Sequence, residues 1–181
     1  MSKISILSFS ERKKGNCASL AHYISSRHRQ EEVDYISVGD LKIKECINCN
    51  YACTNGKCMH YDDGKAYFES TKSAEKVLWL VPLYGGSPTS LLDKMNERSK
   101  DFWTKNDVYY NEFIKKLFII GIGSPEEEDP FGHIFEPVYS KPPLDKHILM
   151  FDAWKSDLNS KWYQFNDANK VRKRVGKFLG I

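Results

Sequence analysis

Four cysteines lie within thirteen residues of this chain, in the stretch CINCNYACTNGKC. They are Cys46, Cys49, Cys53 and Cys58. Four thiolates at this spacing could ligate an iron–sulfur cluster or a tetrahedral zinc ion, because both kinds of site take several sulfur ligands. They could equally form disulfides, line a redox site, or remain as reduced thiols in a structured loop. The surrounding sequence has to decide between these hypotheses.

The composition of the chain limits which of these hypotheses about the four cysteines can apply. The chain has 181 residues, 41% of them hydrophobic and 28% charged, as expected for a single globular domain over residues 1–181. No apolar run approaches the roughly 18 residues that span a membrane, and the first residues lack the shape of a signal peptide. A cytoplasmic location is therefore expected, where structural disulfides are rare. A net charge of +3 gives no reason to expect a nucleic-acid partner.

Strand-like and helix-like segments alternate along the chain. Short runs rich in β-formers predict strands, and apolar residues at helical spacing predict helices. The expected helix caps are Asn16, Ser87 and either Asp62 or Asp63. Pro88 is expected at the first position of the helix that Ser87 caps. The expected strands are 3–10, 33–38, 76–84, 115–124 and 146–154, and the expected helices are 15–28, 62–74, 87–103 and 162–180.

This alternation predicts an α/β fold in which helices cover both faces of a parallel sheet. Five strands in this pattern suit a flavodoxin-like, doubly wound sheet of order 2-1-3-4-5, interrupted by a cysteine-bearing insertion at about 44–62. Ligands of such sheets bind at the carboxyl ends of the strands, near the point where the strand order reverses. The loops after Phe9 and Val81 are therefore the candidate binding loops.

The first of these loops, SERKKGNC (10–17), leads from a strand into a helix. Backbone N–H groups at a helix N-terminus form an anion site. Ser10 and Asn16 can add hydrogen bonds, Arg12 can add charge, and Gly15 permits a close turn. The loop lacks the Walker pattern, and a plain polar turn is the alternative interpretation.

The second loop, PLYGGSPTS (82–90), also runs from a strand into a helix. Tyr84 could stack on a planar ring, and Gly85 and Gly86 leave the backbone open to a ligand. A tight turn with a half-buried tyrosine is the alternative. The two loops together are more specific than either one, because both fall where a doubly wound sheet binds its ligand.

Three stretches resemble the flavodoxin-like NAD(P)H-dependent FMN reductases and the related iron–sulfur flavoproteins. The loop SERKKGNC resembles the family's phosphate loop, CINCNYACTNGKCMHYDD resembles its cysteine-bearing insertion, and VPLYGGSPTSLLDKMNER resembles its second flavin loop and the helix after it. The resemblance covers roughly residues 3–100. It implies that the FMN phosphate binds at Ser10, Arg12, Gly15, Asn16 and Cys17. It implies that the isoalloxazine ring of FMN binds at Pro82, Leu83, Tyr84, Gly85 and Gly86. The third wall of the same site would be formed by Gly121, Gly123 and Ser124.

Some positions depart from the family pattern. Cys17 stands where the family has Thr or Ser, and a thiol is a weak donor. Glu11 replaces a frequent Pro, and its charge beside a phosphate is unfavourable. Asp93 replaces a frequent Lys, and Glu97 stands in for the Asp before Arg98.

The resemblance implies an FMN-dependent oxidoreductase that takes electrons from NAD(P)H and reduces a quinone, a flavin or a similar small-molecule acceptor. FMN performs the chemistry, so no catalytic side chain is predicted. A homodimer or larger homo-oligomer is also implied. Trp79, Trp103 and Trp154 are expected to be packing aromatics.

Two alternatives remain. The first is an iron–sulfur flavoprotein that carries single electrons from ferredoxin through a [4Fe–4S] cluster on the four clustered cysteines. Such proteins have two residues between the second and third cysteines, whereas this chain has three, which could place Cys49 and Cys53 on one helical face. The second is a flavin-free binding or regulatory protein on the same fold, which the departures at Glu11, Cys17 and Asp93 keep open.

Overall fold

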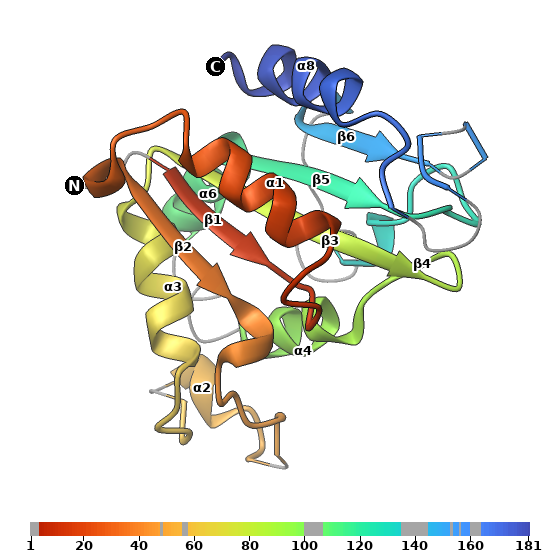
Figure 1. Ribbon diagram of the computed structural model, residues 1–181. Helices are drawn as coiled ribbons and strands as arrows, with labels where there is room; N and C mark the ends of the chain where they lie inside the picture. Colours follow the sequence, from red (N-terminus) through yellow and green to blue (C-terminus); the bar gives the residue numbers. More distant parts are fainter. Residues whose placement is uncertain are drawn as a thin grey trace.

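The computed structural model describes residues 4–47, 49–55, 58–99, 107–134, 145–152, 154–155, 157–159 and 164–181. Its centre is a parallel sheet whose strand order is β2-β1-β3-β5-β6 (Figure 1). The strands are β1 (Ile4–Ser8), β2 (Val33–Ser37), β3 (Lys76–Tyr84), β5 (Leu117–Ile122) and β6 (Ile148–Phe151). In chain order this is the predicted arrangement, so the flavodoxin-like fold class is confirmed.

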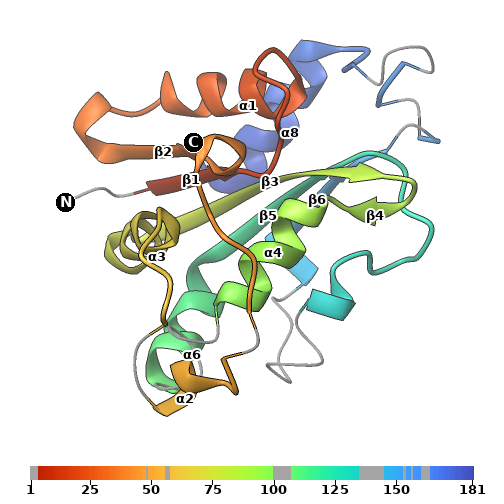
Figure 2. The same cartoon turned by 90° about the horizontal axis from the view of Figure 1, so that it is seen from below.

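Helices cover both faces of the sheet (Figure 2). The helices α1 (Asn16–Ser25) and α8 (Ala168–Leu179) lie on one face. The helices α3 (Gly64–Ser73), α4 (Ser90–Arg98) and α6 (Asp107–Lys116) lie on the other. A single turn, α2 (Ala52–Asn55), lies in the cysteine stretch. The structure also describes short 3-10 turns at Gln30–Glu32, Val38–Asp40 and Asp145–His147.

The central strand β3 shows why the fold has two cores. Its side chains alternate between the two faces of the sheet, as strand geometry requires. Val77, Trp79 and Val81 pack into the core beneath α3, α4 and α6. Leu78 and Leu80 pack into the core beneath α1 and α8. Both faces of this strand are therefore buried, as its unbroken apolar run predicts.

Some predicted boundaries are wrong. Ser87 and Pro88 do not begin a helix; they form a two-residue strand, β4, antiparallel to β3. Thr89 is the cap instead, and its side chain accepts a hydrogen bond from the Leu91 backbone N–H. The helix α4 ends at Arg98, and the helix α6 was not predicted because its sequence continues without a break signal into β5.

The last helix begins later than predicted, at Ala168, because the Asp167 side chain caps it by accepting from the N–H groups of Asn169 and Lys170. Within the described part of the chain, no helix is both long and apolar enough to cross a membrane.

Candidate functional site

A cavity of about 510 Å³ opens at the carboxyl ends of β1, β3 and β5. Every residue that the sequence analysis assigned to a cofactor, apart from Gly121, lines this cavity. These residues are Ser10, Arg12, Gly15, Asn16, Cys17, Pro82, Leu83, Tyr84, Gly85, Gly86, Gly123 and Ser124. Gly121 lies within β5, against Met150 and Phe131. Three loops that are distant in sequence thus meet at one site.

The first loop presents a helix N-terminus to the cavity. Gly15, and not Asn16 as predicted, occupies the N-cap position of α1, and a glycine has no side chain with which to cap the helix. The loop is shaped by buried Ser10, whose Oγ accepts a hydrogen bond of 3.2 Å from the Arg12 N–H. Arg12 and Lys14 add two positive charges to the lining. Backbone N–H groups and two cations at a helix N-terminus favour an anionic ligand.

Cys17 lies at the inner boundary of the cavity. Its side chain is only 3% exposed and packs in the core beneath α1. Burial raises the pKa of the Cys17 thiol to about 12, although hydrogen bonds with Ser10 and Ser8 oppose this shift. The thiol is therefore neutral, and it can offer an anion only a weak S–H donor.

The second loop begins with Tyr84, the last residue of β3, whose side chain is half exposed at 50%. The Arg12 guanidinium lies 5.9 Å from the centroid of its ring, so this cation–π contact joins the first and second loops. Gly85 and Gly86 both have positive φ, of 56° and 82°. A Cβ on Gly85 would meet nothing within 4 Å, whereas one on Gly86 would collide with the Glu126 side chain. Gly85 therefore leaves open space beside Tyr84.

The third wall follows β5. Gly123 has a φ of 149°, and a Cβ there would lie 2.7 Å from the Leu83 carbonyl oxygen. Its N–H donates to the Phe151 carbonyl oxygen at 3.0 Å. Gly123 is thus held between β3 and β6, where a side chain does not fit, so packing requires a glycine at this position.

Sequence reasoning missed seven lining residues, which are Lys14, Ile122, Pro125, Glu126, Trp154, Leu158 and Gln164. The first four lie beside predicted loop residues. The last three follow β6, and no motif marks them. The prediction that Trp154 packs inside the protein is wrong, because its side chain is 84% exposed. Trp79 is buried as predicted, and Trp103 lies outside the described residues.

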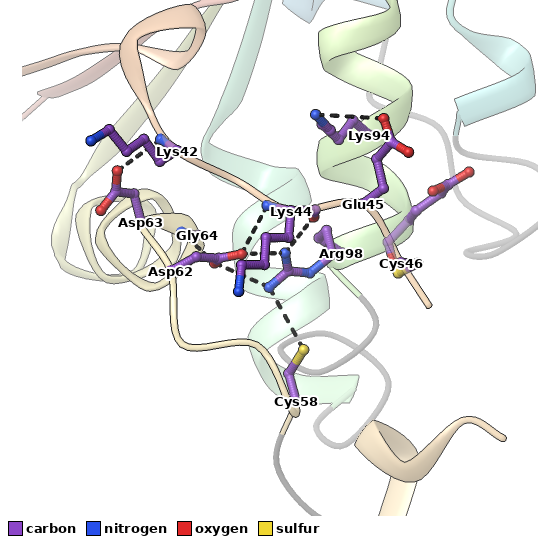
Figure 3. Close-up of polar contacts among 11 residues, drawn as sticks. Lys42, Lys44, Glu45, Cys46, Cys58, Asp62, Asp63, Gly64, Lys94 and Arg98 are labelled. Carbon is purple, nitrogen blue, oxygen red and sulfur yellow. Dashed lines mark hydrogen bonds and ion pairs between the residues drawn. The ribbon is translucent and has the colours of Figure 1, made fainter. Parts of the chain in front are cut away.

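A buried ion pair attaches Asp62, four residues after the cysteine stretch, to the last residue of α4 (Figure 3). The Arg98 Nη1 atom lies 2.8 Å from the Asp62 Oδ2 atom, and both side chains are 5% exposed. Arg98 also donates to the Lys44 carbonyl oxygen at 2.7 Å and to the Cys58 Sγ atom at 3.6 Å. The Cys46 thiol donates to the Glu97 carbonyl oxygen. Both ends of the cysteine stretch are thus hydrogen-bonded to the last turn of α4.

The residues that the structure describes do not form a metal site as they are arranged. Among the described residues, no group of three or more His, Cys, Asp or Glu side chains is placed to hold a metal ion. All five cysteines are free. Asn50 and Tyr51 have positive φ, and α2 begins only at Ala52, so Cys49 and Cys53 do not share a helical face. Burial raises the pKa of Cys46, and Cys53 and Cys58 lie near enough to contribute to this shift.

Comparison of the sequence with known proteins identifies a family model and a relative that this chain resembles. Residues 2–125 match the family model described as NADPH-dependent FMN reductase. An iron–sulfur flavoprotein of Methanocaldococcus jannaschii is 29% identical over 100 residues, which cover 54% of this chain and 52% of the relative. The chain thus spans about half the length of that curated relative.

Two solved structures share the fold across nearly the whole chain. A protein of Streptococcus mutans has a TM-score of 0.65 at 12% identity and covers 98% of this chain and 99% of its own. The flavoenzyme NAD(P)H:(acceptor) oxidoreductase of Paracoccus denitrificans has a TM-score of 0.52 at 13% identity, with coverage of 99% and 96%. At identities of 12% and 13%, these similarities show a shared fold and nothing about function.

Proposed function

The chain belongs to the NADPH-dependent FMN reductase family, and from this we propose that it binds FMN in the cavity and transfers electrons from NAD(P)H to a small-molecule acceptor such as a quinone or a flavin. The observation that carries the proposal is the convergence of twelve predicted cofactor residues, from three separate loops, around one cavity. A volume of about 510 Å³ lies within the range of roughly 300–1,000 Å³ common for small-molecule sites.

The residues present fit FMN at both ends of the cavity. The N-terminus of α1, whose N-cap residue Gly15 has no side chain, would hold the phosphate together with Arg12 and Lys14. The backbone of Pro82–Gly86 would lie along the ring, with open space above Gly85. When bound, FMN would supply the redox chemistry, since a flavin can accept a hydride and release electrons singly. The loops of this chain would orient the ring and exclude water from one side of it.

The phosphate assignment is tested by a double variant, Arg12→Ala with Asn16→Ala. Losing a charged donor should raise the dissociation constant for FMN about 10- to 100-fold, because hydrogen bonds to charged groups stabilise by about 1.5–3 kcal/mol. Lys13→Ala is the matched control, since Lys13 lies in the same loop, pairs with Asp40 at 3.1 Å, and does not line the cavity. Equal FMN affinity in the double variant and the wild type would reject the assignment.

A second candidate is an iron–sulfur flavoprotein that receives electrons from ferredoxin. The printed name of the curated relative and the four-cysteine stretch favour it. The cysteines as arranged do not form a ligand set, so cluster loading would require Cys46, Cys49, Cys53 and Cys58 to move together. Iron, zinc and acid-labile sulfide are measured in protein purified without air to distinguish this candidate from the FMN reductase. About four irons per chain would favour the iron–sulfur flavoprotein.

The proposal also includes a homodimeric state and a cytoplasmic setting, both of which rest on the family resemblance and on composition. Sedimentation at several protein concentrations tests the first. Purified protein that takes up no flavin would favour the remaining alternative, a binding or regulatory protein on this fold.

A further inference from the structure

Trp154 is an exposed aromatic side chain at the entrance of the cavity. It lines the cavity, yet 84% of its surface is accessible to solvent. Indole rings usually bury a large part of their surface, so an indole left this open at a binding cavity offers an unoccupied apolar face. Of the tryptophans that the structure describes, the other, Trp79, is buried in the core.

The backbone that carries Trp154 is held in place by hydrogen bonds, whereas its side chain is largely exposed. The Asp152 Oδ1 atom accepts a hydrogen bond of 2.8 Å from the Trp154 N–H. Asp157 accepts from the Asp152 N–H at 3.3 Å and from Arg174 of α8 at 2.8 Å. Arg174 donates in turn to the Met150 carbonyl oxygen at 2.8 Å. Asp152 and Asp157 are both 7% exposed, so this network is buried and keeps the indole at the cavity.

The order of the strands places Trp154 far from the phosphate loop. Trp154 follows β6, and the phosphate loop follows β1, with β3 and β5 between them. Three strand spacings of about 4.8 Å make this separation roughly 14 Å. Tyr84, which is 50% exposed, lines the cavity between these two points. The cavity is therefore basic at one end and aromatic at the other.

We propose that Trp154 stacks on the planar conjugated ring of the reactant that enters the cavity after the cofactor, an inference that rests on the proposed function. A resident cofactor would be held by the loops at the carboxyl ends of β1, β3 and β5, whereas the more exposed ring of Trp154, beyond β6, would contact the molecule that exchanges. The shared chemistry is a flat conjugated ring, which belongs to the nicotinamide of the donor or to a quinone acceptor.

The test compares Trp154→Ala and Trp154→Phe in the FMN-loaded protein. Steady-state rates are measured in three series, in which the concentration of NAD(P)H, of 1,4-naphthoquinone or of ferricyanide is varied. Ferricyanide has no aromatic ring to stack. Loss of the indole should raise KM for one ring reactant about fivefold, because aromatic stacking stabilises by about 0.5–1.5 kcal/mol. The substrate whose KM rises identifies the partner. Trp154→Phe should restore most of the loss, and KM for ferricyanide should not change.

Lys155→Ala is the matched control, because Lys155 is exposed beside Trp154 and does not line the cavity. Unchanged KM values for both ring reactants in Trp154→Ala would overturn the proposal. An equal rise for ferricyanide would also overturn it, as would loss of FMN from Trp154→Ala, which would assign the indole to the cofactor.

Failure of the proposed function would be visible separately, as an absence of FMN from the wild-type protein. Stacking is then tested in flavin-free protein by titrating 1,4-naphthoquinone against tryptophan emission. Quenching in the wild type that disappears in Trp154→Phe supports the stacking role. Equal quenching in both proteins rejects it.

Discussion

The buried ion pair between Arg98 and Asp62 joins α4 to the residues that follow the cysteine stretch. Asp62→Asn would leave the Arg98 charge buried without a counter-ion, which typically costs about 3–5 kcal/mol. We expect urea unfolding to show a loss of that size. Glu45→Gln is the control: its pair with Lys94 is 4.0 Å long, Glu45 is 83% exposed, and such pairs contribute about 0–1 kcal/mol. Equal losses in the two variants would contradict the assigned role.

The same pair should make stability depend on pH under acidic conditions. Burial by itself would raise the pKa of Asp62, but hydrogen bonds from Arg98 and from the backbone N–H groups of Lys44 and Gly64 lower it to about 2. An unfolded Asp has a pKa of about 3.9. The stabilisation is therefore complete above about pH 4 and is lost as the pH falls toward 2.

We expect Asp62→Asn to flatten the pH dependence of the free energy of unfolding between about pH 4 and 2, measured by urea titration at each pH. The control is Asp63→Asn, because Asp63 is exposed and accepts one backbone hydrogen bond, from Lys42. If the wild type and Asp62→Asn lose stability with the same slope, another carboxyl group is responsible.

Cys17 should be chemically inert in the folded protein despite its place beside the cavity. With a pKa of about 12, only about one thiol in ten thousand is ionised at pH 8, and the thiolate is the reactive form. Native protein treated with iodoacetamide should be labelled at exposed Cys46 and not at Cys17, as read by peptide mass spectrometry. Unfolding in urea should make Cys17 reactive. Rapid native labelling of Cys17 would show that the first loop opens.

At the scale of elements, the turn after β5 should be less tolerant of substitution than the turn after β3. In Gly123→Ala, the new Cβ would lie 2.7 Å from the Leu83 carbonyl oxygen, and the φ of 149° would be retained. We expect a loss of about 3 kcal/mol from strain and overpacking together. Gly85→Ala adds a Cβ in open space at a φ of 56°, so we expect about 1 kcal/mol.

Thermal unfolding of the two alanine variants would measure this difference. Similar midpoints for Gly85→Ala and Gly123→Ala would mean that β3 and β5 can separate at their ends without loss of stability.

The elements also show which features could be predicted. The strand β3 was predicted with its observed bounds, because a mainly apolar run buried on both faces lies between the charged Glu75 and the glycines Gly85 and Gly86. Ser87 and Pro88 carry the same signals as a helix start, and only their pairing with Leu83 and Tyr84 makes them a strand. The contact between Asp62 and Arg98 joins residues 36 positions apart, so propensity alone could not indicate it.

At the scale of the whole molecule, the predictable part of the site is the part that the sheet itself assembles. The strand order brings the ends of β1, β3 and β5 together, so residues next to those ends could be assigned from sequence. Trp154, Leu158 and Gln164 reach the cavity from a segment beyond β6 that is held by contacts with Arg174 of α8. Such tertiary contacts leave no local signal.

If the cavity holds FMN by its phosphate, ligand binding should stabilise the whole fold. At a free FMN concentration 100 times its dissociation constant, linkage predicts about 2.7 kcal/mol. For a chain of this length that corresponds to a rise of roughly 5–10 °C in Tm. Riboflavin, which lacks the phosphate, should give less than half of that rise at the same concentration, as measured by differential scanning fluorimetry at a wavelength free of flavin emission or by calorimetry.

The double variant Arg12→Ala with Asn16→Ala isolates the phosphate contribution. It should remove the advantage of FMN over riboflavin and leave the smaller, ring-dependent shift in place, because the ring loop at Pro82–Gly86 is unchanged. A double variant that keeps the full difference between the two ligands would place the phosphate elsewhere in the cavity. A wild-type protein that responds equally to both ligands would show that the basic end of the cavity does not contact a phosphate, and the charges of Arg12 and Lys14 would then need another ligand.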